Sequence, residues 1–336
     1  MNFINPKSKR HNIFRNVYDS DLYANAWKYK DSGLAFPLLV DIELTNHCNL
    51  KCFFCGQVAM ARKKGFITKE VFKKAVDECA LHKTPIRLIR WGEPFLHAKA
   101  IEFSSYAKSR GLSVHITTNG LLLKKRQSLA LLEMQLDSIK FSFQGATKER
   151  YQEIRNTSSY DVLKRNILEL VSLRKDKEKP YIHISSTMTN ETKAQIDGFL
   201  KYWGEIVDSV SIGRTNLSLF HSDRILDARQ RGLFEKLKEK ETLKKEYRPC
   251  GEVYRQLSVD WDGKVSACCS DFDNELTVGH LRDSTLEKIW KQSAPLKSIR
   301  VLLSRGMFRS LTKCSSCFQY YEDINNPGGT IKKKSI

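Results

Sequence analysis

Short apolar runs alternate with amphipathic helical patterns from about residue 38 to residue 212 of this 336-residue chain. This alternation is typical of βα units around a parallel sheet, because parallel strands need a crossover connection, usually a helix. The predicted strands are Leu38–Leu44, Ile86–Arg90, Ser113–Thr118, Ser138–Phe143, Tyr181–Thr187 and Val207–Ile212, and the predicted helices are Thr68–Leu81, Ala98–Arg110, Lys124–Met134, Tyr160–Arg174 and Thr192–Tyr202. Six repeats predict an α/β fold, a partial (β/α)6 barrel of the TIM type, while a doubly wound sheet fits the same periodicity.

Polar or glycine-containing loops follow four of these strands. They are Asn46–Gln57 after the first strand, Trp91–Pro94 after the second, Asn119–Gly120 after the third and Gln144–Gly145 after the fourth. In both candidate architectures, ligands bind beyond the carboxyl ends of the strands, where such loops meet. We therefore expect these loops to form one rim that carries the active site.

Eight of the nine cysteines fall into two islands. The chain shows neither the apolar core of a signal peptide nor a run of roughly 18 apolar residues. We therefore expect a cytoplasmic protein, and clustered cysteines in a reducing compartment indicate metal ligands rather than disulfides. Cys79 stands apart in a helical pattern and is predicted to be a small buried hydrophobe.

The first island has the spacing Cys-x3-Cys-x2-Cys on one loop, at Cys48, Cys52 and Cys55. Three thiolates in this pattern suit three corners of a cuboidal iron–sulfur cluster and leave the fourth corner open for a substrate. A zinc site is the alternative, but structural zinc takes four ligands.

The segment Cys48-Asn49-Leu50-Lys51-Cys52-Phe53-Phe54-Cys55 resembles the cluster motif of the radical SAM superfamily. The resemblance implies a 4Fe-4S cluster on the three cysteines, with S-adenosyl-L-methionine chelating the open iron. An electron from the cluster would then cleave this molecule to methionine and a 5′-deoxyadenosyl radical. Phe54 is expected to form a wall against the adenine, and simple loop packing is its alternative role.

Further positions resemble family residues around S-adenosylmethionine. Gly92-Glu93-Pro94 is similar to the family's Gly-Gly-Glu-Pro turn, which holds the methionine ammonium, although Trp91 replaces the first glycine. Ser142 and Arg155 are similar to residues that meet the methionine carboxylate, which an arginine can grip with two parallel hydrogen bonds. An exposed cation is the alternative for Arg155. Asn119 is expected either to line the site or to shape its turn.

The second island lies in a region where residues 257–265 are predicted to form a hairpin with an Asp-Gly turn. Its cysteine spacing, together with Gly263, resembles the SPASM extension in its shortened, single-cluster form, called twitch. The resemblance implies an auxiliary 4Fe-4S cluster whose ligands are Cys250, Cys268, Cys314 and Cys317. Cys269 is the fallback for Cys268, which satisfies the Gly-x4-Cys spacing, since adjacent strand residues point to opposite faces. A zinc ribbon is the alternative for these cysteines taken alone.

These patterns divide the chain into five segments. They are an N-terminal extension of unknown role (1–37), a radical SAM core (38–220), a helical linker (221–249), the auxiliary-cluster domain (250–322) and a basic tail (323–336).

The substrate is the least determined feature. Single-auxiliary-cluster relatives include dehydrogenases of amino-cyclitols, so a small polar, sugar-like substrate and a redox-coupled oxidation are placed first. A peptide-modifying maturase is second, because residues 1–37 are too few for a separate peptide-recognition domain. A non-catalytic metal-binding protein that docks nucleic acid is third; no recognition module for nucleic acid is identified. No general base or hydrogen donor can be assigned.

The formal net charge of +19 favours acidic partners. A reduced flavodoxin or ferredoxin is the expected electron donor.

Overall fold

The computed structural model describes residues 2–29, 33–188, 191–215, 217, 221–239, 243–245, 250–315, 317 and 321–323. The strands are β1 (Asn2–Ile4), β2 (Leu39–Ile42), β3 (Ile86–Leu88), β4 (Val114–Thr118), β5 (Ser138–Gln144), β6 (Tyr181–Met188), β7 (Ser209–Arg214), β8 (Leu243–Lys245), β9 (Gln256–Val259), β10 (Lys264–Ser266), β11 (Thr277–His280) and β12 (Tyr321–Asp323). The helices are α1 (Phe14–Tyr18), α2 (Asp21–Ala24), α3 (Gly56–Ala59), α4 (Lys69–Leu81), α5 (Ala100–Ser109), α6 (Lys125–Glu133), α7 (Lys148–Arg155), α8 (Tyr160–Arg174), α9 (Lys193–Gly204), α10 (Ala228–Lys238), α11 (Glu252–Arg255), α12 (Leu286–Gln292), α13 (Ala294–Ser304) and α14 (Thr312–Ser315). Short 3-10 turns are η1 (Ala26–Tyr29), η2 (Pro94–Leu96), η3 (Ser222–Arg224) and η4 (Phe308–Ser310).

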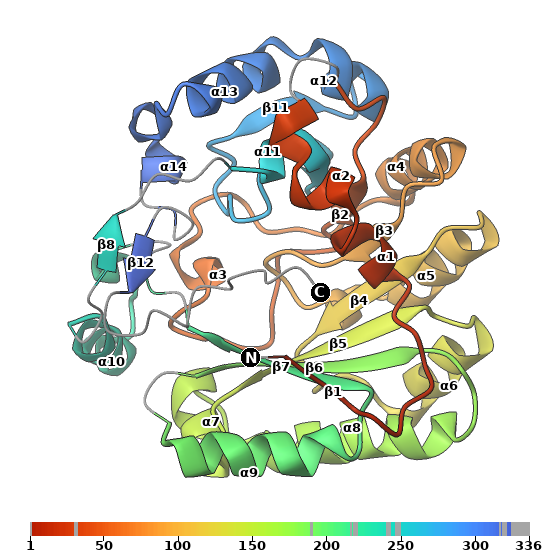
Figure 1. Cartoon of the computed structure of the whole chain (residues 1–336), viewed down its shortest axis with the longest axis vertical. Coiled ribbons are helices and arrows are strands. Elements are labelled where there is room, and N and C mark those ends of the chain that lie inside the picture. Colours follow the sequence, from red (N-terminus) through yellow and green to blue (C-terminus); the bar gives the residue numbers. More distant parts are fainter. Residues whose placement is uncertain are drawn as a thin grey trace.

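One curved sheet organises the molecule, in the order β1-β7-β6-β5-β4-β3-β2-β9-β10-β11 (Figure 1). The strands β2 to β7 each pair in parallel with the next. Helices separate these strands along the chain, which gives the six-stranded partial barrel that the sequence predicts. The doubly wound alternative is wrong, because the strand order follows the chain without reversing.

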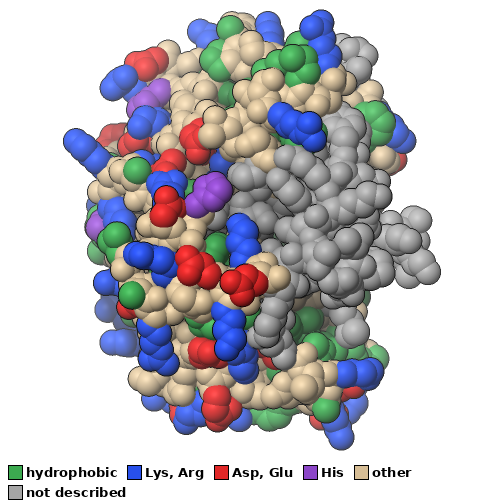
Figure 2. All heavy atoms as spheres, turned by 90° about the vertical axis from the view of Figure 1, so that its left-hand side faces the viewer, with side chains coloured by type: hydrophobic (Ala, Val, Ile, Leu, Met, Phe, Trp, Pro, Cys, Tyr) green, Lys and Arg blue, Asp and Glu red, His purple; other side chains and the backbone are tan. Residues whose placement is uncertain are grey.

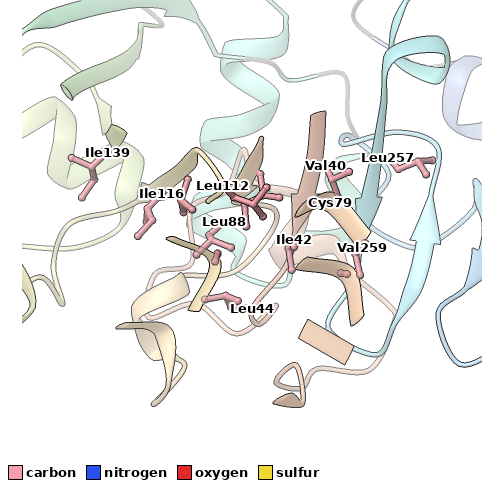
Figure 3. Close-up of a cluster of buried hydrophobic side chains, with 14 of the residues drawn as sticks. Val40, Ile42, Leu44, Cys79, Leu88, Leu112, Ile116, Ile139, Leu257 and Val259 are labelled. Atoms are coloured by element: carbon pink, nitrogen blue, oxygen red, sulfur yellow. The ribbon is translucent and has the colours of Figure 1, made fainter. Parts of the chain in front are cut away.

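The outer face of this sheet packs against helices. Alternate strand residues such as Ile42, Leu88, Ile116 and Ile139 are buried there, and Cys79 of α4 belongs to the same cluster (Figure 3). Cys79 is 0% exposed and is therefore the small buried hydrophobe that its helical position predicted. The other set of alternate residues faces the inside of the barrel.

The helix α7 was missed by the sequence prediction. Only Tyr151, Ile154 and Arg155 of its eight residues are buried, so the apolar periodicity is too weak to indicate a helix. Thr147 caps the helix by accepting a hydrogen bond from the backbone of Arg150. This helix matters because it carries Arg155.

The C-terminal cysteine region shares the barrel sheet. Its strand β9 pairs in parallel with β2, and β9 and β10 form the predicted hairpin. Gly263 in the turn has φ of +89°, a conformation that favours glycine. Both cysteine regions are therefore connected to neighbouring strands of the sheet, β2 and β9.

The N-terminal segment, to which the sequence assigned no role, covers the amino end of the barrel interior. β1 pairs antiparallel with β7 at the edge of the sheet. The ring of Phe14 lies 5.4 Å from that of His115 at the start of β4. The hydroxyl of Tyr23 donates to the side chain of Gln256 at the start of β9, at 3.3 Å. Residues 324–336 of the predicted basic tail lie outside the described residues.

Candidate active site

The first cysteine island lies on the loop that follows β2. Thr45 and Asn46 hold this loop to residues 63–65: the Thr45 hydroxyl donates to the Gly65 carbonyl at 2.6 Å, and the Asn46 amide donates to the Lys63 carbonyl at 2.9 Å. Cys55 then donates its backbone N–H to the Cys52 carbonyl at 3.0 Å. A short loop with both ends fixed gives the three thiols defined positions before any metal binds.

The thiols of Cys48 and Cys55 sit in surroundings that disfavour free thiolates. Burial is the main cause that raises the pKa of Cys48 to about 11 and that of Cys55 to about 12, and the neighbouring Cys52 acts in the same direction. Among the described residues, no three His, Cys, Asp or Glu side chains form a group suited to a single metal ion.

The turn after β3 lies directly against the cysteine loop. Glu93 donates its backbone N–H to the His47 carbonyl at 2.8 Å. A Cβ atom at Gly92 would lie 1.9 Å from the Thr45 carbonyl oxygen, so this close approach requires glycine. Trp91, the departure from the family turn, packs its ring edge-on at 5.6 Å against Phe272 of the C-terminal region.

The carboxylate of Glu93 is buried and fully engaged. It accepts hydrogen bonds at 2.7 Å from both the Thr118 hydroxyl and the Asn119 N–H, and another from the Phe95 N–H at 3.2 Å. Burial raises the pKa of this carboxyl group overall, and these hydrogen bonds make the increase smaller. The carboxylate therefore ties the loop after β4 to the turn after β3. Pro94 begins the short turn η2 that follows.

Two side chains, Asn119 from the loop after β4 and Arg155 from helix α7, reach the cysteines themselves. Asn119 donates its amide to Cys48 Sγ at 3.8 Å and to Asn49 Oδ1 at 2.8 Å. Arg155 is buried, not an exposed cation, and its guanidinium donates to Cys52 Sγ at 3.7 Å and to the Ser142 carbonyl. Positive charge and N–H donors beside the sulfur atoms suit the negative charge that thiolate ligands carry.

The predicted rim is thus formed by three of the four loops together with α7. Ser142 contributes its carbonyl oxygen to Arg155. Phe54 packs its ring perpendicular to that of Phe53, with centroids 5.6 Å apart, so loop packing accounts for its described contacts. Gln144 ends β5, and its side-chain amide donates to the hydroxyl of its register partner Thr187 on β6 at 3.3 Å.

The second island draws its cysteines from three elements. Cys250 precedes α11, Cys268 and Cys269 follow β10, and Cys314 and Cys317 lie in and after α14. The pKa of Cys250 is raised to about 12 by burial and then by Cys317, and burial raises that of Cys314 to about 12 as well. Cys250, Cys269, Cys314 and Cys317 lie near one another, since Cys317 and Cys269 raise the pKa of Cys250, and Cys250 raises that of Cys314. Cys268 Sγ accepts a hydrogen bond from the Ser270 N–H at 3.4 Å.

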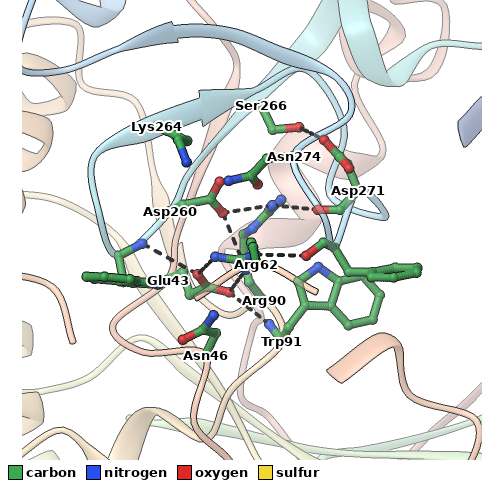
Figure 4. Close-up of polar contacts among 12 residues, drawn as sticks. Glu43, Asn46, Arg62, Arg90, Trp91, Asp260, Lys264, Ser266, Asp271 and Asn274 are labelled. Atoms are coloured by element: carbon green, nitrogen blue, oxygen red, sulfur yellow. Dashed lines mark hydrogen bonds and ion pairs between the residues drawn. The ribbon is translucent and has the colours of Figure 1, made fainter. Parts of the chain in front are cut away.

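A buried ionic network joins the ends of β2 and β3 to the C-terminal region (Figure 4). Arg62 holds Glu43 with two hydrogen bonds, of 2.8 and 2.6 Å. Arg90 lies 2.8 Å from Asp260 Oδ1 and donates to the Cys268 carbonyl at 3.1 Å. Burial raises the pKa of Asp260, and Arg90 opposes this shift. The sequence analysis did not predict this network. The signal that could have revealed it is a charged residue at the end of each of two apolar strands, Glu43 after β2 and Arg90 after β3.

The comparisons with known proteins agree with this arrangement. The sequence matches the radical SAM superfamily over residues 42–203 and an iron-sulfur cluster-binding domain, SPASM, over residues 250–318. The chain therefore belongs to the radical SAM superfamily and carries a C-terminal SPASM domain. Membership implies a 4Fe-4S cluster, S-adenosyl-L-methionine and auxiliary iron–sulfur chemistry, as the cysteine patterns predicted.

Three similar proteins span most of the chain. The mycofactocin maturase MftC of Mycobacterium tuberculosis is 25% identical over 314 residues, covering 86% of this chain and 78% of MftC. The antilisterial bacteriocin subtilosin biosynthesis protein AlbA of Bacillus subtilis is 24% identical over 319 residues, covering 84% of this chain and 67% of AlbA. The crystal structure of Streptococcus suis SuiB bound to precursor peptide SuiA shares the fold, with a TM-score of 0.61 at 15% identity, covering 88% of this chain and 74% of SuiB.

Proposed function

We propose that this radical SAM enzyme modifies a peptide. The sequence analysis placed a small polar substrate first, but two of the relatives that span most of the chain are named as a mycofactocin maturase and a bacteriocin biosynthesis protein. These names support the alternative, a peptide maturase. The shortness of residues 1–37 carries little weight against a peptide, because that segment covers the barrel interior instead of forming a recognition domain.

The observation that carries the proposed site is the convergence of Arg155 and Asn119 on the cysteine loop. We assign Cys48, Cys52 and Cys55 as the ligands of the catalytic cluster, which when bound supplies the electron that cleaves S-adenosylmethionine. Asn119 and Arg155 hold N–H donors near this centre, where they would orient the ligands and the methionine carboxylate.

Around these residues, the turn Gly92-Glu93-Pro94 would present backbone carbonyls to the methionine ammonium. Glu93 acts chiefly by holding that turn against the next loop, since all its described hydrogen bonds are internal. Ser142 and Phe54 remain assigned to the walls of the same site.

The auxiliary cluster is assigned to Cys250, Cys268, Cys314 and Cys317. A second cluster can accept an electron when hydrogen abstraction leaves a substrate radical, which would make the net reaction an oxidation. The hydrogen bond from Arg90 to the Cys268 carbonyl would hold this centre against the end of β3.

The electron donor is proposed to be an acidic flavodoxin or ferredoxin. On the face shown in Figure 2, basic and acidic side chains are interspersed rather than gathered by sign. No described helix is long and apolar enough to cross a membrane. Interspersed charge gives no support to nucleic acid as the partner on that face.

The test is anaerobic reconstitution followed by reduction with dithionite. We expect brown protein with about eight irons, from two clusters of four, and 5′-deoxyadenosine that increases when the right peptide is added. Short peptides encoded beside this gene are the first candidates, with mass spectrometry of the peptide as the readout. Turnover with a cyclitol or sugar alcohol, and none with peptides, would restore the small-molecule hypothesis.

A further inference from the structure

The inside of the barrel carries a layer of polar side chains that the proposed cofactor site leaves unused. The strand register places Asp41 beside Arg87, Arg87 beside His115, and Lys140 beside His183. Paired residues on neighbouring strands face the same side of a sheet, and the alternate residues on these strands pack under the helices. The polar layer therefore faces inward.

Most members of this layer satisfy one another. Arg87 donates to both carboxylate oxygens of Asp41, with Nε to Oδ1 at 2.6 Å and Nη2 to Oδ2 at 2.8 Å. His115 and His183 each have both ring nitrogens within 3.0 Å of serine or threonine hydroxyls. Burial lowers the pKa of both histidines, that of His183 to about 3, so both rings are neutral at physiological pH.

Lys140 differs from its neighbours. In the described part of the chain, no hydrogen bond or ion pair reaches its ammonium group, although the side chain keeps some accessible surface. Burial, and then the charge of Arg87, lower the pKa of Lys140 to about 8, while Asp41 and Cys269 act in the opposite direction. Two cations in this layer thus face one carboxylate. A desolvated ammonium without a partner is costly, and a bound anion would offset that cost.

The position of Lys140 suits a ligand that enters from the cysteine side. The amino end of the barrel is covered by the N-terminal helices, where Arg87 also donates to the Tyr18 hydroxyl at 3.2 Å. Toward the other end, Lys140 and Ser142 lie on the same face of β5, about 7 Å apart along the strand. The Ser142 carbonyl accepts a hydrogen bond from Arg155, which contacts Cys52.

We propose that Lys140, supported by this inward layer, binds a carboxylate group of the substrate below the S-adenosylmethionine site. The inference deepens the proposed function and rests on it for the nature of the substrate. A peptide supplies a carboxylate from its C-terminus or from an aspartate or glutamate side chain. Either group, anchored at Lys140, would hold a neighbouring carbon toward the cysteine loop.

The first test is chemical labelling of the reconstituted holoprotein. Acetic anhydride should acetylate Lys140 above pH 8, and N-acetylglycine, a mimic of a peptide C-terminus, should slow this reaction. The neutral N-acetylglycinamide should not. N-acetylaspartate α-amide carries only a side-chain carboxylate, so protection by this compound would indicate that Lys140 binds an aspartate or glutamate side chain. Lys193, whose side chain is 88% exposed, is the internal reference and should react equally with every probe present.

Two outcomes of the labelling would overturn the inference. Equal protection by the acid and the amide would mean that charge is not recognised. Failure of acetic anhydride to label Lys140 would mean that the site is closed to ligands. This result is expected if the ammonium group faces only the nearby Cys269. Neither outcome depends on S-adenosylmethionine cleavage, so failure of this inference is distinguishable from failure of the proposed function.

The second test is equilibrium dialysis with radiolabelled N-acetylglycine. We expect Lys140→Met to weaken binding by about tenfold or more, because a hydrogen bond to a charged group contributes on this scale. Lys140→Arg keeps the charge and should retain most of the affinity, and Lys193→Met is the exposed control. Matching circular dichroism spectra would verify folding. Equal binding by Lys140→Met and the wild type would sink the proposal.

Discussion

The two cysteine islands differ in how their ligands are brought together. Cys48, Cys52 and Cys55 lie within eight residues on one loop, whose ends are fixed by the backbone and by Asn46. The second island spans residues 250–317 and draws on α11, β10 and α14. A loop can position its own ligands, whereas the second site exists only if distant elements pack correctly.

Because of this difference, we expect the two sites to be disturbed by different substitutions. The first island depends on close local contacts, above all the approach of Gly92 to the Thr45 carbonyl. The second depends on the buried pairing of Arg90 with Asp260. The same Arg90 holds the Cys268 carbonyl, so damage to the network should disturb the auxiliary cluster before the catalytic one.

The largest expected effect is that of Cys52→Ala. It should abolish 5′-deoxyadenosine formation and remove about four of about eight irons, because a cluster left with two ligands on this loop is not retained. Iron analysis and chromatography of the reaction products measure this. Loss of all the iron would show that the second island cannot hold a cluster without the first.

Next comes the choice between Cys268 and Cys269. Cys268→Ser should remove the auxiliary cluster while reductive cleavage of S-adenosylmethionine continues, and Cys269→Ser should keep both clusters. The prediction follows the Gly-x4-Cys spacing, although after burial and Cys317 it is Cys269, not Cys268, that raises the pKa of Cys250. Electron paramagnetic resonance of each reduced variant decides the matter, and the reverse pattern would make Cys269 the ligand.

Arg90→Ala should lower the free energy of unfolding by about 3–5 kcal/mol, because it leaves the buried Asp260 carboxylate with only the more distant Arg62, at 3.8 Å. Chemical denaturation under anaerobic conditions measures the effect. Arg282→Ala, which breaks an exposed pair with Asp283, is the control and should leave stability unchanged within error. If Arg90→Ala and its control behaved alike, the network would not join the two regions energetically.

Gly92→Ala should cost about 1–3 kcal/mol, the usual range for a side chain forced into packed space. It should also weaken S-adenosylmethionine binding, measured by calorimetry, because the turn must move away from Thr45. Gly198→Ala in helix α9 is the matched control: its Cβ would meet nothing within 4 Å. There alanine should add about 0.5–1 kcal/mol of stability. Wild-type affinity in Gly92→Ala would exclude a role for the close approach.

The smallest effect concerns the polar layer inside the barrel. The folded state holds His183 with a pKa lowered to about 3, whereas the unfolded chain binds a proton near the usual value of 6.5. Stability should therefore fall as pH drops below about 6.5, by about 1 kcal/mol at pH 5.5 for this residue. His183→Asn should flatten the wild-type slope over this range in urea titrations. An unchanged slope would place the pH dependence elsewhere.

Much of the fold followed from periodicity because helices α4, α5, α6, α8 and α9 and strands β2 to β7 have strong apolar patterns. The helix α7 escaped prediction because few of its residues are buried. Among site residues, the cysteine pattern predicted the family and its cofactors, as the family matches confirm. The roles of Glu93 and Arg155 needed the structure, since nothing in the sequence says that their partners are Thr118, Asn119 and Cys52.

The sequence by itself determined the class of chemistry, because ligand spacing on one short loop is a local property of the chain. It also determined the alternation of six strands with helices, because strand and helix periods are local too, but the strand order that excludes a doubly wound sheet is a tertiary feature. Only the tertiary structure decided that β9 joins the sheet beside β2, that Arg90 holds the Cys268 carbonyl, and that Lys140 lies inside the barrel without a hydrogen-bond partner among the described residues. Those features depend on contacts between residues far apart in the chain, which no local pattern records.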